Sequence, residues 1–350
     1  MTEPLLSIRD LVTEFSTPDG VVHAVDGVSY DVHPGETLGV VGESGSGKSV
    51  TVMSILRLIP EPPGRIAGGE IWLEDRNLLE LSDDELRQVR GKDIAMIFQD
   101  PMTSLNPVLT VGSQIAEAIT THDSKVNDAE ARRRTVELLE LVGVPNAAAR
   151  FGQYPHEYSG GMRQRAMIAM AIANQPKILI ADEPTTALDV TIQAQVLEVL
   201  SKAQKETNAG TILITHDLGV IAEMADRVVV MYGGRVVETG TVEDIFHNPS
   251  HPYTLGLLSS LPRTDRRVDR LEPITGQPPS LINLPKGCAF HPRCRMSAGR
   301  DTCRTEVPEL VELGDGRASA CHFHDELPEE IARIEAAMGL DFGRDQREGE

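Results

Sequence analysis

Residues 42–49 read Gly42-Glu43-Ser44-Gly45-Ser46-Gly47-Lys48-Ser49, which matches the pattern G-x-x-x-x-G-K-[ST]. The glycines allow backbone N–H groups to turn toward phosphate oxygens. Lys48 brings a positive charge to the β- and γ-phosphates, and Ser49 offers a hydroxyl to Mg²⁺. An apolar run, Thr37-Leu-Gly-Val-Val41, precedes this loop, and residues 50–58 can form a helix after it. This context predicts a nucleoside triphosphate site formed by Gly42 to Val50.

A second apolar run, Ile178-Leu-Ile-Ala181, ends in Asp182 and Glu183. A carboxylate at the end of a buried strand can lie beside the metal ion of a phosphate site. We therefore expect Asp182 to hold Mg²⁺ through water, and Glu183 to polarise the water that attacks the γ-phosphate. An apolar run followed by two acidic residues is weak evidence for a hydrolytic site by itself. Together with the phosphate loop in the same domain, it indicates hydrolysis of the nucleotide.

Apolar runs that resemble strands alternate with helical stretches over the first 240 residues, as in α/β proteins. With the phosphate loop, this predicts an α/β fold of the P-loop NTPase class. Residues 105–175 differ, because Asn127 and Glu130 resemble a helix start and apolar residues then recur at helical spacing. We interpret them as a helical subdomain, although helices that simply cover the sheet are the alternative.

The charge balance restricts the partners. Lys and Arg number 33 against 53 Asp and Glu, so the net charge is −20, which argues against nucleic acid as the main partner. No run approaches the 18 apolar residues typical of a membrane span, and the N-terminus lacks the features of a signal peptide. We expect a cytoplasmic chain that docks onto other proteins if it acts at a membrane.

A third string narrows the class of NTPase. Tyr158-Ser-Gly-Gly-Met-Arg-Gln-Arg165 resembles the signature sequence of the ATP-binding cassette (ABC) family, with Tyr and Met in place of the usual Leu and Gln. The nucleotide-contacting part, Ser159, Gly160 and Gly161, is intact. In that family this cradle caps the γ-phosphate of ATP bound in the opposite subunit. The resemblance therefore implies that hydrolysis needs two subunits facing head to tail.

Further positions match elements of the ABC family in the expected order. Gln99 looks like the glutamine that joins the nucleotide site, with its Mg²⁺, to the transport channel, and Asp189 lies in the loop after Glu183. His216 matches the histidine that contacts the γ-phosphate, and Phe15 stands where an aromatic ring stacks on adenine. The resemblance covers residues 1–245 and implies four catalytic residues, which are Lys48, Gln99, Glu183 and His216.

Other strings resemble the oligopeptide/dipeptide importer branch of this family, in which nickel importers are close relatives. They are Gln99-Asp-Pro-Met-Thr-Ser-Leu-Asn-Pro107, His251-Pro-Tyr-Thr254 and Gly287-Cys-Ala-Phe-His-Pro-Arg-Cys294. This resemblance implies an ATPase that powers import of di- or oligopeptides from the cytoplasmic face of the membrane, as a peripheral subunit. It implies as partners a second, unlike ATPase chain, two transmembrane permeases and an extracytoplasmic peptide-binding protein. Residues 246–350 would form the C-terminal extension of this branch.

Two other classes compete with transport. A soluble ABC ATPase acting on nucleic acid is disfavoured by the net charge of −20. A GTPase or a small-molecule kinase leaves Ser159 to Gly161 unexplained.

All four cysteines lie in the extension, spaced Cys288-x5-Cys294-x8-Cys303-x17-Cys321. A reducing cytoplasm disfavours disulfides. Structural zinc sites usually begin with a tight C-x2-4-C pair, which is absent, whereas wider spacing can reach the corners of a [4Fe–4S] cluster. We favour the cluster in a structural role. Zn²⁺ and free thiols remain alternatives, and the nearby His291, His322 and His324 keep a mixed Cys/His zinc site open.

Overall fold

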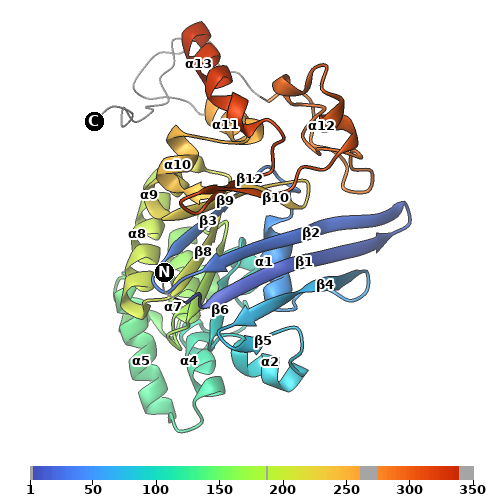
Figure 1. The fold of residues 1–350 in the computed structure, drawn as a ribbon. Coiled ribbons are helices and arrows are strands. Elements are labelled where there is room, and N and C mark those ends of the chain that lie inside the picture. The colour runs from blue at the N-terminus through green and yellow to red at the C-terminus, as the bar shows by residue number, and fades with distance from the viewer. Residues whose placement is uncertain (1–2, 187, 261–273, 339–350) are drawn as a thin grey trace.

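The computed structural model describes residues 3–186, 188–260 and 274–338. Within them the larger sheet has the strand order β11-β12-β10-β9-β3-β8-β7-β6 (Figure 1). Neighbours from β9 to β6 are parallel, and β10, β12 and β11 are antiparallel additions. The strands are β3 (Thr37–Val41), β6 (Ile94–Ile97), β7 (Ile178–Asp182), β8 (Gly210–Ile214), β9 (Arg227–Tyr232), β10 (Arg235–Thr241), β11 (Val311–Gly314) and β12 (Arg317–Ser319).

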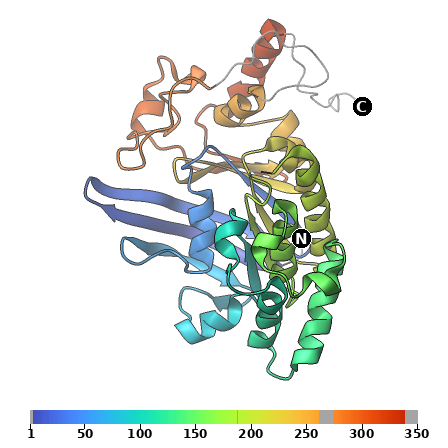
Figure 2. The ribbon, with the colours of Figure 1, turned by 180° about the vertical axis from the view of Figure 1, so that it is seen from behind.

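The central strands are buried on both faces, as their continuous apolar runs predict. Alternate residues of β7 enter different cores because side chains alternate across a strand. Ile178 and Ile180 pack with the residues of β1, β2 and α1 (Lys48–Ile55), whereas Leu179 and Ala181 pack with α8 (Val190–Thr207) and α9 (Leu218–Met224). The α/β fold predicted from the sequence is confirmed by this layered arrangement (Figure 2).

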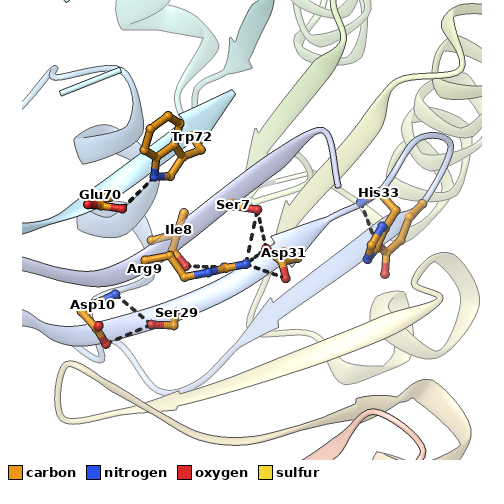
Figure 3. Close-up of polar contacts among 10 residues, drawn as sticks. Ser7, Ile8, Arg9, Asp10, Ser29, Asp31, His33, Glu70 and Trp72 are labelled. Carbon is orange, nitrogen blue, oxygen red and sulfur yellow. Dashed lines mark hydrogen bonds and ion pairs between the residues drawn. The ribbon is translucent and has the colours of Figure 1, made fainter. Parts of the chain in front are cut away.

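A smaller antiparallel sheet, β2-β1-β4-β5, covers one of these cores. Polar pairs line part of its surface: Arg9 forms an ion pair with Asp31 at 2.7 Å, and the indole N–H of Trp72 donates to Glu70 at 2.8 Å (Figure 3). Such exposed pairs contribute at most about 1 kcal/mol each, so burial of the apolar face holds this sheet. Its strands are β1 (Leu6–Thr17), β2 (Gly20–Val32), β4 (Gly64–Leu73) and β5 (Arg76–Asn77).

The stretch predicted to be helical contains α4, α5 and α7, which pack against one another. The Asn127 side chain caps α5 by accepting a hydrogen bond from the backbone N–H of Glu130 at 3.0 Å, so this helix starts where the sequence predicts. The limits of the subdomain stay a prediction. The helices α2 (Asp83–Val89) and α3 (Pro101–Ser104) precede this stretch. The stretch itself contains α4 (Val111–His122), α5 (Asp128–Leu141), α6 (Ala147–Arg150), a 3₁₀ turn (Pro155–Glu157) and α7 (Gly160–Ala171).

The C-terminal extension continues the larger sheet, because β12 pairs with β10 across the predicted boundary near residue 245. Glu238 of β10 is buried and accepts hydrogen bonds from the backbone N–H groups of Ser250 and His251; burial raises its pKa to about 7. The boundary itself stays a prediction, and residues 261–273 and 339–350 of the extension lie outside the described ranges. Its helices are α10 (Val242–His247), α11 (Pro252–Ser259), α12 (Asp301–Thr305) and α13 (Leu327–Met338), with 3₁₀ turns at Arg295–Ser297 and His324–Glu326.

Every helix in the described ranges is too short or too polar to span a bilayer.

Candidate nucleotide site

The phosphate loop connects β3 to α1 and depends on glycines that no other residue could replace without strain. Gly42 has φ +151°, and a Cβ there would lie 2.2 Å from the backbone oxygen of Met231. Gly47 has φ +103°, and a Cβ there would lie 2.4 Å from the backbone oxygen of Ala24. The neighbouring strands therefore press on both ends of the loop. Between these ends, Ser44 and Gly45 are exposed, as a ligand-binding turn requires.

Lys48 begins α1 and is 6% exposed. Its ammonium donates to the backbone oxygens of Gly42 at 2.7 Å and Glu43 at 3.0 Å, so it lies across the mouth of its own loop. Burial lowers its pKa, while the negative charges of Glu183, Asp182 and Glu43 oppose that shift. These contacts place a cation where the loop would receive phosphate oxygens.

Ser49 and Asp182 meet although they are far apart in sequence. The Ser49 hydroxyl donates to Asp182 Oδ1 at 3.0 Å. Asp182 ends β7 and is 7% exposed, and burial raises its pKa although the Ser49 hydrogen bond opposes the shift. A hydroxyl and a carboxylate at this separation are oxygen ligands of the kind that Mg²⁺ uses in nucleotide sites, so these residues fit that ion.

Within the described part of the chain, the Glu183 carboxylate has three side-chain partners. Gln99 Nε2 donates to it at 2.8 Å, the Thr186 hydroxyl donates at 2.9 Å, and His216 Nδ1 lies 3.5 Å from its other oxygen. Glu183 itself has φ +47°, and its backbone N–H donates to the oxygen of Ile214 in β8. The carboxylate is thus held in one orientation by residues from three loops.

These residues meet because they follow parallel strands at the same end of the sheet. The phosphate loop follows β3, Gln99 follows β6, Glu183 follows β7 and His216 follows β8. The carboxyl ends of parallel strands are where α/β sheets bind ligands. Thr186 was not predicted from the sequence, because a hydroxyl three residues after Glu183 is its only sequence signal.

The second predicted cradle is exposed. Ser159 caps α7 by accepting from the backbone N–H of Met162, and Gly160 is exposed beside it. A Cβ on Gly161 would lie 2.7 Å from Ile192 of α8, so helix packing requires this glycine. Asp189 is exposed and caps α8 by accepting from the N–H of Ile192. No hydrogen bond found in the described residues joins this cradle to the phosphate loop of its own chain.

Phe15 lies in β1 at intermediate exposure, where it pairs with Val22 of β2 and Gly64 of β4. Its ring edge packs over Gly64, since a Cβ on that glycine would lie 2.9 Å from the ring. No contact found among the described residues brings Phe15 to the phosphate loop, so its place under adenine stays a prediction.

The four cysteines are free thiols that line one cavity of about 20 Å³, together with residues that include Phe290, His291, His322 and Phe323. Burial raises the pKa of Cys294 to about 11 and of Cys321 to about 12, and the other two thiols shift in the same direction. No group of three or more His, Cys, Asp or Glu side chains in the described ranges forms a recognisable metal site. The four thiols thus line one cavity, but no metal site is recognised among the described residues, so the predicted cluster stays a prediction.

Comparison with known families matches two parts of the chain. Residues 25–186 match the family described as ABC transporter, and residues 237–303 match the oligopeptide/dipeptide transporter C-terminal region. Among solved structures, the ATP-binding cassette MJ0796, described as dimeric and bound to ADP and Pi, aligns with a TM-score of 0.61 at 26% identity. That alignment covers 68% of this chain and 98% of the cassette.

Two relatives from Bacillus subtilis align over most of their length. The oligopeptide transport ATP-binding protein OppD is 57% identical over 82% of this chain and 80% of OppD. The dipeptide transport ATP-binding protein DppD is 54% identical over 93% of this chain and 97% of DppD. The two family matches include the phosphate loop, the paired carboxylates and three of the four cysteines, and both relatives are more than 50% identical over most of the chain. The chain therefore belongs to the ABC transporter family as an ATP-hydrolysing subunit, with the C-terminal region of the oligopeptide/dipeptide transporters.

Proposed function

We propose that this chain powers the import of dipeptides or longer peptides through an ABC transporter in the membrane. The observation that carries the proposal is the combination of an ATPase site with the oligopeptide/dipeptide C-terminal region in one chain. The names of OppD and DppD, which align over most of this chain, support peptides as the transported solute.

Each polar side chain of the site has a proposed role in hydrolysis. The loop from Gly42 to Val50 binds the triphosphate. Ser49, Gln99 and Asp182 would hold Mg²⁺, which would neutralise negative charge at the phosphates. Glu183 accepts the proton of the attacking water, and Gln99, Thr186 and His216 orient its carboxylate. Lys48 and His216 stabilise negative charge on the transferring phosphoryl group.

Each site needs a second subunit in this proposal. Ser159, Gly160 and Gly161 are directed to the nucleotide of a partner ATPase, which agrees with the exposure of Ser159 and Gly160. Asp189 lies nearby, at the start of α8. We propose that the partner is an unlike ATPase chain. Two permeases then anchor the pair to the cytoplasmic face of the membrane, and an extracytoplasmic protein delivers the peptide.

Purification of the assembled transporter tests this composition. A tag on this chain is expected to recover a second, unlike ATPase in equal amount together with two permeases. Proteoliposomes holding the complex and its peptide-binding protein are expected to take up dipeptides or longer peptides when ATP is supplied. A Lys48→Ala complex is the control, which should assemble but not transport. Recovery of this chain alone in two copies contradicts the unlike pair, and uptake of Ni²⁺ but of no peptide contradicts the proposed solute.

We also propose that Cys288, Cys294, Cys303 and Cys321 hold a structural [4Fe–4S] cluster, with Zn²⁺ as the alternative. The support is their convergence on one cavity from positions spread over 34 residues, counted inclusively from 288 to 321. Buried thiols with raised pKa values stay protonated at neutral pH, and a bound cation is what would favour their thiolates. A segment poor in apolar residues gains stability from such a crosslink.

Metal and sulfide analysis of protein prepared without oxygen tests the cluster. The wild-type chain is expected to contain about four iron and four sulfide per chain, as the proposed cluster requires, and to show the broad visible absorbance of iron bound to thiolates. Cys294→Ser should lose most of this iron and lower the melting temperature. His322→Asn, in the same cavity, is the matched control and should keep the iron. Zinc alone in the wild type, lost in both variants, would instead establish a mixed Cys/His site.

A further inference from the structure

The phosphate loop is attached to the cysteine-bearing segment through Glu43. The backbone N–H of Glu43 donates to the Tyr253 hydroxyl at 2.7 Å. Its carboxylate forms a two-pronged ion pair with Arg293, in which Nη2 donates to Oε1 at 2.9 Å and Nη1 donates to Oε2. The two residues are 250 positions apart, and Arg293 directly precedes Cys294. Both the backbone and the side chain of one loop residue are therefore fixed by the extension.

Arg293 is built into the extension rather than lying on its surface. Its side chain is 4% exposed. Its Nε donates to the backbone oxygen of Thr275 at 3.1 Å, and its Nη1 also lies 3.2 Å from the Tyr232 hydroxyl. A guanidinium with this many fixed partners loses little further freedom when it pairs with a carboxylate, so the contact is well oriented.

Aromatic rings pack together beside the same contact. The ring centroids of Tyr232 and Tyr253 lie 4.6 Å apart, and each lies 5.3 Å from that of Phe290. Tyr253 lies in the first turn of α11, and Phe290 lies between Cys288 and Cys294. The extension therefore approaches the loop as a packed unit, and Arg293 and Tyr253 are its polar contacts with Glu43.

Glu43 also contacts the loop residues that would face the phosphates. Its backbone oxygen accepts from Lys48 Nζ at 3.0 Å and from the N–H of Ser46 at 3.2 Å. Burial lowers the pKa of Lys48, and the negative charge of Glu43 is one of those that oppose this shift. A carboxylate in this position would repel a triphosphate, and Arg293 supplies the charge that compensates it.

We propose that Arg293 is a positioning residue for ATP binding: it neutralises Glu43 and fixes the start of the phosphate loop, so that the cysteine-bearing extension forms part of the nucleotide site. The proposal rests on the assignment of the phosphate loop as that site. It explains why a segment without any ATP-binding motif packs against the loop, and it assigns Glu43 a charge partner that the loop pattern does not specify.

Equilibrium ATP binding by the full-length chain, with KM and kcat measured in the assembled transporter, tests the proposal. Arg293→Met is expected to weaken ATP binding and raise KM by about tenfold, within the range of coupling between sites, with kcat little changed. The loss should shrink at high salt, because salt screens the repulsion between Glu43 and the phosphates. Arg304→Met removes an exposed arginine beside Cys303 and serves as the matched control, with expected wild-type affinity.

A second substitution separates charge compensation from loss of folding. Adding Glu43→Gln to Arg293→Met removes the uncompensated carboxylate and is expected to restore most of the affinity, whereas a variant that weakened binding by misfolding would not recover. Unchanged ATP affinity in Arg293→Met overturns the positioning role, and so does a double variant no better than the single one. Lys48→Ala tests separately whether the phosphate loop is the ATP site. If this variant binds ATP with wild-type affinity, the loop is not the site.

Discussion

Glu183→Gln binds ATP with wild-type affinity and hydrolyses it about 10²- to 10⁴-fold more slowly, the range lost when a general base is removed. Glutamine has the size of glutamate and can keep contacts with Thr186 and His216, so the loop retains its shape. It cannot accept a proton from water at neutral pH. Single-turnover hydrolysis in the assembled transporter, measured beside equilibrium ATP binding, separates the two effects.

The exposed Glu223 of α9 provides the matched control, because Glu223→Gln makes the same chemical change away from the site. That variant should hydrolyse ATP at the wild-type rate. Turnover within threefold of wild type in Glu183→Gln would remove Glu183 from the mechanism, and loss of ATP binding would make it a binding residue instead.

Gly47→Ala is expected to abolish ATP binding and to destabilise the chain by roughly 3 kcal/mol, as a strained and colliding backbone position would. Its φ of +103° is unfavourable for alanine, and the added Cβ would lie 2.4 Å from the backbone oxygen of Ala24 in β2. A backbone atom within a sheet cannot move aside as a side-chain tip can. Chemical denaturation and ATP titration measure the two effects.

Gly45→Ala, in the same loop, separates the effect of a positive φ from the effect of steric overlap with a neighbouring strand. Gly45 also has a positive φ, +80°, but a Cβ there would meet nothing within 4 Å. Gly45→Ala should lower the free energy of unfolding by about 1 kcal/mol, which is the penalty for alanine in the left-handed region. Equal losses of stability in the two variants would show that contact with Ala24 does not shape the loop.

Local pattern was sufficient for the centre of the fold. A continuously apolar strand followed by a glycine-rich loop is specified by neighbouring residues, so β3, its loop and a helix after it could be predicted from the sequence. The helix runs over Lys48–Ile55, whereas the sequence predicted it over residues 50–58. Asp182 could be placed for the same reason, because it ends an apolar run. Its contact with Ser49 then follows from two parallel strands that end at the same level.

The contacts that the sequence did not reveal all depend on tertiary packing. Thr186 meets Glu183 because the chain turns after β7, and a hydroxyl three residues away occurs in many sequences without this contact. Arg293 contacts Glu43, which is 250 positions earlier in the chain. The motif that contains Arg293 predicted the C-terminal extension but not this contact. No local pattern encodes such a pair. The roles of Phe15 and Asp189 came from family resemblance, and the structure places one in β1 and the other at a helix start.

The pairing of β12 with β10 has a consequence for how this protein avoids self-association. If the chain ended near residue 245, the N–H and C=O groups along one side of β10 would face water and could recruit a strand from another molecule. The hairpin of β11 and β12 pairs with β10 at Glu238 and Thr239, and its outer strand, β11, is short and exposes Glu312. The extension thus covers the part of β10 on which a strand of another copy could otherwise pair.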